Sequence, residues 1–282
     1  MSEMPMVEFD LDLNDDKTRL ADDIVRLAKD HDIPDGNVVE ALVGMIGHLG
    51  GIPNTVFEEP PEYARDILGP SELTHPVAQP APPATSTHGF FDVVSARASR
   101  RDFGTEKLDL KRLMALLHWT AGKRGECIAY DYRSAPLRYI PSAGGLASID
   151  AYVVAASVEG LEPGAYYYDY RSGLRLTAKG YMAWKVAELN PGQEWLGRAA
   201  AFIVFVANTD RVVHKYGPMA FKLLMMDAGI AVGHAELVAT ALELRTCIIG
   251  GLSQRKMSRL LRLDDTQRVP IVTLAVGTRS GV

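Results

Sequence analysis

Two hydrophobic patterns alternate along the chain. In some stretches apolar residues recur every three or four positions, which is typical of amphipathic helices. In others they form short continuous runs bounded by turn residues, which is typical of buried strands. The helical spacing predicts helices over residues 17–31, 37–49, 90–98, 109–121, 181–189 and 219–244. The continuous runs predict strands over residues 150–158, 164–170, 173–177, 201–207 and 270–276.

The order of these elements indicates the fold class. Strands 164–170 and 173–177 pair naturally as a hairpin around Arg171 and Ser172. The stretch 219–244, with Pro218 in its first turn, is apolar on nearly all sides, so it must be buried in a core or against another subunit. Strands separated by long helices, together with one hairpin, predict an α+β or mixed α/β fold.

A proline-rich segment divides the chain. Residues 75–84 contain four prolines in ten positions, which excludes a regular helix or a central strand and predicts an extended connector. We therefore predict an acidic helical module over residues 1–75, a proline-rich linker over 76–87 and the main domain over 88–282.

The formal net charge of −5 conceals an asymmetry. Residues 1–80 hold 17 acidic and five basic side chains and carry −12, so the remainder carries +7. A net-basic body suits an anionic ligand or the phosphate of a cofactor. An acidic appendage that improves solubility, or that packs against the basic body, explains the asymmetry equally well.

The composition indicates a soluble protein, with 47% hydrophobic and 23% charged residues. No stretch approaches the roughly 18–20 uninterrupted apolar residues of a membrane span. The first residues are acidic, unlike the basic start of a signal peptide. The two cysteines, Cys127 and Cys247, form neither a disulfide framework nor a metal-ligand cluster. These features predict a cytoplasmic location, with neither a membrane nor nucleic acid as a partner.

Two short segments have the chemistry to hold a cofactor. The segment 97–103, with three arginines and Ser99, can clamp a phosphate because guanidinium groups bind phosphate bidentately. The small residues of 141–145 allow backbone N–H groups to approach a planar ligand closely. A solvated arginine cluster and an ordinary glycine turn remain the simpler interpretations of each segment taken alone.

Two further segments lie later in the chain. Ile249, Gly250 and Gly251 can place an amide against a ring nitrogen, although a plain loop has the same composition. Lys215 and Tyr216 can act as a proton-transfer pair, although a surface lysine beside a half-buried tyrosine is equally common. Neither glycine segment fits the dinucleotide-binding or P-loop patterns, and no metal-ligand spacing accompanies the histidines.

In combination and in this order, the four segments resemble the nitroreductase superfamily, and most of all its SagB/McbC-type branch of flavin dehydrogenases. The resemblance covers about residues 88–282. Its opening R-R-S-x-R-x-F pattern matches at Arg97, Ser99, Arg101 and Phe103, with Ala98 in place of the second arginine. Residues 158–169 are similar to the branch's V-E-G-L-x-P-G-x-Y-x-Y-D run, which plain nitroreductases lack.

Further matches follow the same order. Residues 141–146 match the branch's P-S-A-G-G-L, but Ala147 and Ser148 stand where it has Tyr-Pro, which predicts a different wall on the substrate side. Residues 215–217 match its K-Y-G element, 227–229 stand for E-A-G, and 249–251 for I-G-G.

The resemblance implies an α+β homodimer with FMN at the subunit interface and the long apolar helix in that interface. It implies that Lys215 and Tyr216 are the catalytic acid–base pair. The FMN-binding residues that it implies are Arg97, Ser99, Arg101, Pro141, Ser142, Ala143, Gly144, Gly145, Ile249, Gly250, Gly251 and Arg279.

The implied reaction oxidises a thiazoline or oxazoline within a peptide natural product to a thiazole or oxazole. Lys215 or Tyr216 removes the proton next to the imine, and hydride leaves the adjacent carbon for flavin N5. The implied partners are a second copy of the chain, a peptide or carrier-bound heterocyclic substrate, and other subunits of a biosynthetic complex.

Three other functions are compatible with the sequence. The first is an NAD(P)H-dependent flavin reductase acting on nitro compounds or quinones. The second is another dehydrogenation of a peptide, and the third is a non-catalytic subunit of a peptide-modifying complex.

Overall fold

The computed structural model describes residues 76–78, 86–127, 135–181, 183–189, 192–263 and 267–279. The predicted acidic module over residues 1–75, with its two helices, lies outside the described residues. Of the predicted linker, residues 76–78 and 86–87 are described.

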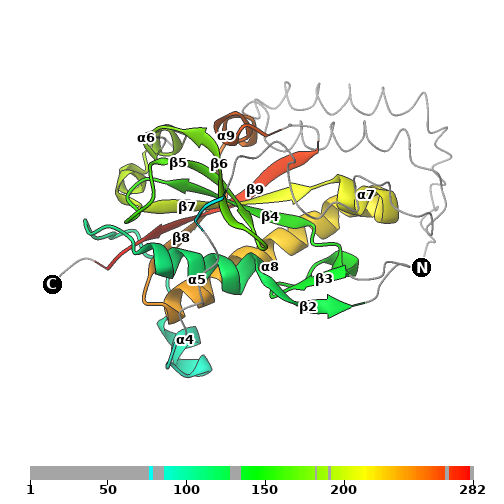
Figure 1. Cartoon of the computed structure of the whole chain (residues 1–282), viewed down its shortest axis with the longest axis horizontal. Helices are drawn as coiled ribbons and strands as arrows, with labels where there is room; N and C mark the ends of the chain where they lie inside the picture. The colour runs from blue at the N-terminus through cyan, green and yellow to red at the C-terminus, as the bar shows by residue number, and fades with distance from the viewer. Residues whose placement is uncertain are drawn as a thin grey trace, which may run out of the picture.

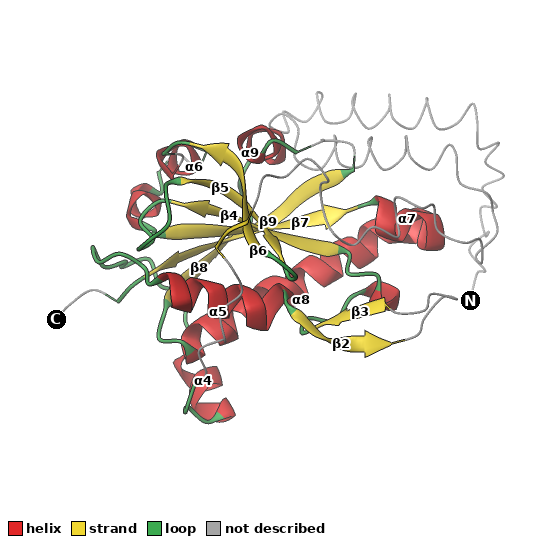
Figure 2. Ribbon diagram, in the orientation of Figure 1, coloured by secondary structure: helices red, strands yellow, loops and turns green. Residues whose placement is uncertain are grey.

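A seven-stranded sheet forms the centre of the molecule, with strand order β1-β6-β5-β4-β7-β9-β8 (Figures 1 and 2). Every pair in it is antiparallel. Its strands are β1 (Pro76–Ala78), β4 (Ile149–Ala155), β5 (Gly164–Asp169), β6 (Gly173–Lys179), β7 (Ala201–Asn208), β8 (Arg245–Ile249) and β9 (Arg268–Gly277). A separate hairpin pairs β2 (Lys123–Cys127) with β3 (Ala135–Arg138).

Helices cover both faces of the sheet (Figure 2). On one face lie α5 (Leu110–Ala121) and the long α8 (Ala220–Ala241), and on the other lie α6 (Ala183–Glu188) and α9 (Gln254–Leu261). Two hydrophobic clusters accordingly form, one on each side. The remaining helices are α4 (Phe90–Ala96), α7 (Asp210–Tyr216) and the 3-10 turns η1 (Ala143–Gly145), η2 (Glu194–Arg198) and η3 (Gly217–Met219).

The burial of the central strands accounts for their apolar sequences. Every residue of β4, β5 and β7 is buried. A strand that is covered on both faces has no solvent side to alternate with, so it reads as a continuous apolar run. The prediction of an α+β fold is therefore confirmed, and so are the predicted strands and the hairpin around Arg171 and Ser172.

Several boundaries differ from the prediction. The helix predicted over 90–98 ends at Ala96, and the strand predicted over 150–158 ends at Ala155. Pro218 does not lie in the first turn of α8. Gly217, with a φ of 49°, caps α7 and begins the separate turn η3, in which Pro218 is the second residue. Residues 76–78 of the predicted linker form β1, which is consistent with proline because β1 is an edge strand.

The two ends of the sheet carry different segments. At one end, which we call the α7 end, β4 and β9 begin and β7 and β8 finish. At the opposite end, which we call the arginine end, β9 finishes and β8 begins, since Arg245 pairs with Gly277. Figure 1 shows α7 and the C-terminal part of the chain on opposite sides of the molecule.

The stretch Asp210–Ala241 could cross a membrane by length and composition alone. It is broken at η3, however, and its long part α8 packs against α5, β8 and β9. These contacts are those of a helix in the core of a soluble fold.

The close approach of Gly277 to Phe103 gives a test of the packing at the arginine end. A Cβ at Gly277 would lie 2.7 Å from Cδ1 of Phe103, which is itself buried. Gly277→Ala should therefore lower the free energy of unfolding by about 1–3 kcal/mol, measured by urea denaturation. Gly197→Ala is the matched control, because no atom lies within 4 Å of that Cβ position. Equal stability of both variants would contradict the packing.

Candidate functional site

Residues 141–148, the glycine loop, lead into β4 through an unusual backbone. Gly144, Gly145 and Ala147 have φ values of 59°, 70° and 49°. Left-handed conformations are easy for glycine but cost an alanine about 1 kcal/mol. No atom lies within 4 Å of the position that a Cβ of Gly145 would take. The loop therefore leaves open space beside its backbone, as a planar ligand requires.

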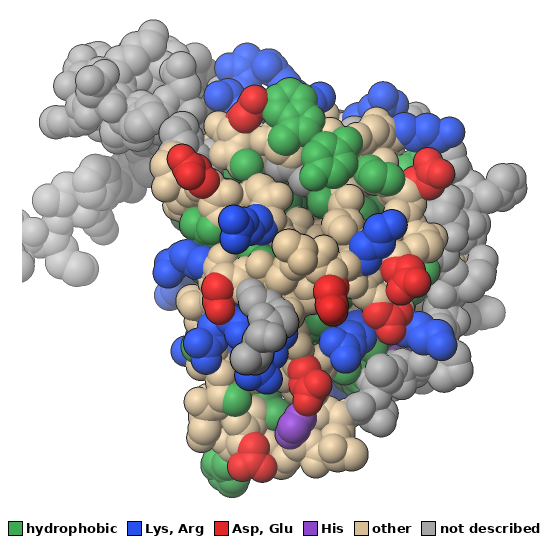
Figure 3. Space-filling view, turned by 90° about the vertical axis from the view of Figure 1, so that its left-hand side faces the viewer, with side chains coloured by type: hydrophobic (Ala, Val, Ile, Leu, Met, Phe, Trp, Pro, Cys, Tyr) green, Lys and Arg blue, Asp and Glu red, His purple; other side chains and the backbone are tan. Residues whose placement is uncertain are grey.

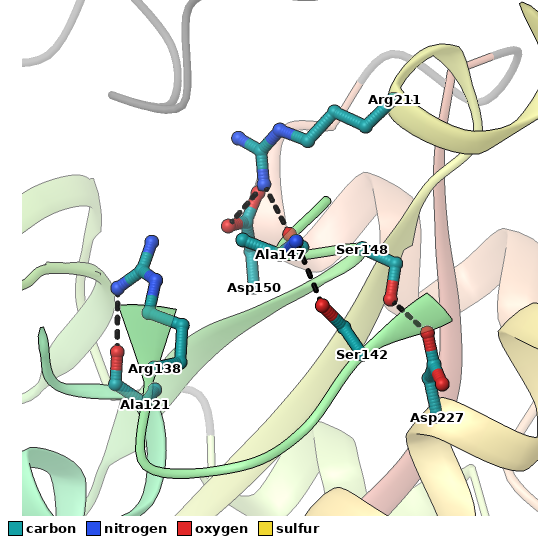
Figure 4. A network of polar contacts seen from close by, with 8 residues as sticks. All are labelled: Ala121, Arg138, Ser142, Ala147, Ser148, Asp150, Arg211 and Asp227. Atoms are coloured by element: carbon teal, nitrogen blue, oxygen red, sulfur yellow. Dashed lines mark hydrogen bonds and ion pairs between the residues drawn. The ribbon is translucent and has the colours of Figure 1, made fainter. Parts of the chain in front are cut away.

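A carboxylate from α8 fixes this loop (Figure 4). Oδ2 of the buried Asp227 accepts hydrogen bonds from the backbone N–H of Ala143 at 2.8 Å and from the hydroxyl of Ser148 at 2.5 Å. Within the loop, the N–H of Ala147 donates to Oγ of Ser142 at 2.9 Å. Ala147 and Ser148 are both buried, so their side chains face the interior. That Ala147 and Ser148 make the substrate-side wall differ from that of the branch stays a prediction.

Lys215 and Tyr216 lie in the last turn of α7, at the same end of the sheet as the glycine loop. Both side chains are half-buried, and Nζ of Lys215 lies 4.9 Å from the centre of the Tyr216 ring. Helix α7 follows β7 directly, and β7 pairs with β4 along its whole length. The predicted acid–base pair therefore lies on the helix that follows β7, and the predicted ring-binding loop precedes the adjacent strand β4, at the same end of the sheet.

The arginine segment, residues 97–102, extends the sheet at the opposite end. Ser99 forms a parallel bridge with Thr246 at the start of β8, and the N–H of Arg100 donates to the Thr246 carbonyl at 2.7 Å. Side chains alternate along such an extended segment. Arg97 reaches Glu236 of α8, with 3.5 Å between Nη1 and Oε2, while Arg101 lies over the Trp195 ring.

The buried acid and thiol beside these arginines have altered acidities. Burial raises the pKa of Glu236, and Arg97 lowers it by a smaller amount. Burial likewise raises the pKa of the Cys247 thiol, which Arg101 partly offsets. A phosphate bound at Arg97 would share that guanidinium with Glu236.

Arg279 lies in a different place from Arg97 and Arg101. A cleft of about 800 Å³ brings it together with Arg100 and Arg245, between α4 and the end of α8. On the face at this end, Lys and Arg side chains are interspersed with Asp and Glu (Figure 3). Arg245 is paired with Asp102. The structure therefore places Arg100, one of the three arginines of the predicted phosphate clamp but not one of the FMN-binding residues that the resemblance implies, near Arg279.

Ile249, Gly250 and Gly251 stand where the edge strand β8 ends. Ile249 is buried, whereas both glycines are exposed, and a Cβ at Gly250 would meet open space. Gly250 is four residues beyond Thr246, the partner of Ser99, which is about 13 Å along a strand. The edge of β8 thus offers arginines at one end and open glycine backbone at the other.

These residues fit FMN, which needs cations for its phosphate and accessible backbone for its ring. The arginine segment supplies the cations, and Gly145 and Gly250 supply backbone without side chains. One chain does not gather all of them, however. Two strands, β7 and β9, lie between β4 and β8, so the glycine loop lies about 14 Å across the sheet from the edge of β8.

The V-E-G-L-E-P-G run has a structural explanation. It is the turn between β4 and β5 at the arginine end, with Gly160 at a φ of 73°. The N–H of Glu159 in this run donates to the Leu108 carbonyl, and the carbonyl of the preceding Ser157 accepts from the Leu108 N–H. This run lies away from Lys215 and Tyr216.

Sequence reasoning missed three buried charged residues: Asp150, Arg211 and Glu236. Each has a weak signal. Asp150 opens an apolar strand, Glu236 interrupts an apolar helix, and Arg211 stands one helical turn before Lys215. A charge in an apolar run requires a partner, although the sequence does not name it.

A family model described as "Nitroreductase family" matches residues 94–278. A protein of Methanocaldococcus jannaschii that is named as a nitroreductase is 25% identical over 190 residues, 67% of this chain and 90% of that protein.

Two solved structures share the fold. One, a Ralstonia eutropha protein named as a nitroreductase, has a TM-score of 0.60 at 23% identity, over 82% of this chain and 98% of that one. The other is the E. coli microcin synthetase McbBCD complex with truncated pro-MccB17 bound. Its matching chain has a TM-score of 0.54 at 18% identity, over 86% of this chain and 93% of that one.

The family match defines the class of protein, a flavin-type oxidoreductase. The chain belongs to the nitroreductase family, because the family model spans well over half of its length.

The Asp227 anchor yields a direct test. Asp227→Ala removes the acceptor of two hydrogen bonds and should lower the free energy of unfolding by about 3 kcal/mol, measured by urea denaturation. Asp227→Asn keeps an oxygen at that position and should lose less than half as much. Equal losses in the two variants would show that Asp227 does not anchor the loop.

Proposed function

We propose that this chain is an FMN-dependent dehydrogenase that oxidises a thiazoline or oxazoline in a peptide to a thiazole or oxazole. The observation that carries the proposal is the position of Lys215 and Tyr216 on α7, which follows β7, at the end of the sheet where the glycine loop leads into the adjacent strand β4. The K-Y-G element and the V-E-G-L-E-P-G run are shared with the azoline dehydrogenase branch. The fold is also that of a chain in the microcin synthetase McbBCD complex.

The chain's own residues bind, orient and move a proton in this reaction. Lys215 or Tyr216 accepts the proton from the ring carbon next to the imine, and the contact between the two side chains holds them together for this step. Bound flavin supplies the acceptor for the hydride from the adjacent carbon, with oxygen as the final oxidant. The substrate thereby loses one proton and one hydride, and the new C=C bond completes the aromatic ring.

The cofactor is assigned to two groups of residues. Arg97, Ser99 and Arg101 hold the phosphate end, with Arg279 contributing from the neighbouring cleft. The backbone of residues 249–251 and of the glycine loop holds the ring. Arginine is suited to the first role because its planar fork pairs with phosphate oxygens.

We propose further that a second copy of the chain completes the site. The glycine loop and Lys215 of one copy meet the β8 edge of the other, which removes the separation of about 14 Å within one chain. The exposed apolar face of α8 supports this assembly, because Met226 and Ile230 are 51% and 43% exposed. Met219 and Ile248 add to it, at 59% and 37%. A cytoplasmic homodimer that receives a peptide or carrier-bound substrate fits these features.

A flavin reductase is the second candidate. The relatives from Methanocaldococcus jannaschii and Ralstonia eutropha are both named as nitroreductases, which favours reduction by NAD(P)H. The two functions differ in the source of electrons. Rapid bleaching of the bound flavin by NADPH, without conversion of a thiazoline peptide, supports the reductase.

Replacing the predicted base tests the dehydrogenase directly. Lys215→Ala and Tyr216→Phe should leave FMN bound and the protein yellow, but lower kcat by about 10²–10⁴-fold. Activity is measured as the loss of two hydrogens from a thiazoline peptide by mass spectrometry.

Lys185→Ala is the matched control for this test. Lys185 also lies over an aromatic ring, that of Trp184, but on α6 and away from the proposed site. It should keep wild-type activity. A yellow Lys215→Ala protein with full dehydrogenase activity would contradict the assignment of Lys215 as the base.

A further inference from the structure

A fully buried ion pair lies beside the glycine loop, and the proposed reaction does not use it. The side chains of Arg211 and Asp150 are each 2% exposed. Nη1 of Arg211 donates to Oδ1 of Asp150 at 2.8 Å and to the carbonyl oxygen of Ala147 at 2.8 Å. A single guanidinium nitrogen therefore joins three segments, namely α7, β4 and the glycine loop (Figure 4).

Arg211 is placed to control where Lys215 lies. It is the second residue of α7 and stands four positions before Lys215. Residues four apart share one face of a helix, and a short helix moves as a unit. A shift of the Arg211 side chain relative to the loop is therefore passed on to Lys215 and Tyr216.

In the glycine loop, the hydrogen bond from Arg211 is accepted by Ala147, which is the most strained residue of the loop. Ala147 is a non-glycine residue at a φ of 49°, and its N–H already donates to Ser142. Because this conformation costs about 1 kcal/mol, the alanine relaxes unless surrounding bonds hold it. Asp227 holds Ala143 near the beginning of the loop and Ser148 at its end, and Arg211 holds the carbonyl of the strained Ala147.

The ion pair contributes little to stability, because some of its polar atoms are buried without partners. Nε and Nη2 of Arg211 and Oδ2 of Asp150 have no hydrogen-bond partner among the described residues. Burial alone disfavours the charged guanidinium, but Asp150 and the neighbouring Tyr167 outweigh it and keep the pKa of Arg211 raised. An apolar pair of similar volume is often as stable as a buried ion pair, or more so. A role in geometry explains why this costly pair is present.

We propose that Arg211 is a positioning residue that couples the helix carrying Lys215 and Tyr216 to the glycine loop. The inference rests on the proposed function for the role of Lys215, but its effect on the loop does not. Asp150 acts through Arg211, by fixing the orientation of the guanidinium.

The test compares two variants in the full-length protein. Asp150→Leu/Arg211→Met replaces both charges by apolar side chains and should fold with a thermal stability near that of the wild type. Arg138→Met is the matched control. Arg138 is a guanidinium of the same buried region, but it donates to the carbonyl of Ala121, outside the loop (Figure 4).

The first measurement is amide hydrogen exchange in the cofactor-free protein. The amides of residues 142–147 should exchange about tenfold faster in the double variant than in the wild type, and at the wild-type rate in Arg138→Met. The second measurement uses the FMN-loaded protein. There kcat for a thiazoline peptide should fall by about 10²-fold in the double variant, with KM nearly unchanged, because the base is misplaced.

The outcomes separate the inference from the proposed function. A wild-type enzyme that is inactive on thiazoline, with faster loop exchange in the double variant, overturns the reaction but keeps the coupling of α7 to the loop. Unchanged loop exchange and unchanged kcat in the double variant overturn the positioning role. If the double variant does not fold, Arg211→Lys replaces it, since lysine keeps the charge for Asp150 but loses the planar fork that also reaches Ala147. The same exchange measurement then decides.

Discussion

The need to cover helix α8 is the constraint on which the rest of the structure depends. The helix is apolar on nearly all sides, so most of its surface must be covered, and a charge that it buries requires a partner. It nevertheless buries two carboxylates, Asp227 and Glu236. Nine residues, or about 13 Å of helix, separate them. Each must be satisfied by a partner, and the partners are the glycine loop and Arg97.

One helix therefore sets the positions of two segments that the proposed cofactor needs. The loop belongs to the end where Lys215 lies, and Arg97 belongs to the end where β8 begins. The exposed apolar stripe of α8 runs between them, through Met226 and Ile230. A second copy packed on that stripe would bring the loop of one chain toward the arginines of the other.

The central strands could be predicted from the sequence because a strand that is buried on both faces has a continuous run of apolar residues, as in β4 and β7. It did not reveal β8, a five-residue edge strand directly after a long helix, or α9, in which only Met257, Ser258 and Leu261 are buried. The prediction placed Pro218 in the first turn of the long helix. Proline is equally favourable in the first turn of η3, where Pro218 lies.

For the site, too, the residues of single short segments could be predicted, whereas contacts between distant segments could not. Local chemistry made the arginines, the glycines and the Lys215-Tyr216 pair candidates, and their order along the chain, through the family resemblance, singled them out. Their distribution between two ends of a sheet follows from strand order, which no single segment encodes. The partnership of Asp150 with Arg211 joins residues 61 positions apart. Ala147 and Ser148 are bound from two distant helices, since Ser148 donates to Asp227 of α8 and the Ala147 carbonyl accepts from Arg211 of α7.

The central claim is that two copies of the chain build each site, and mixed dimers test it most directly. Arg101→Glu removes the phosphate half of the site, and Lys215→Ala removes the proton-transfer half. If the halves come from different copies, a mixed dimer contains one intact site. Mixing and re-associating the two inactive variants should then restore about a quarter of the wild-type rate, since half of the dimers are mixed. If each chain carries a whole site, no mixture regains activity, and that result would contradict the account.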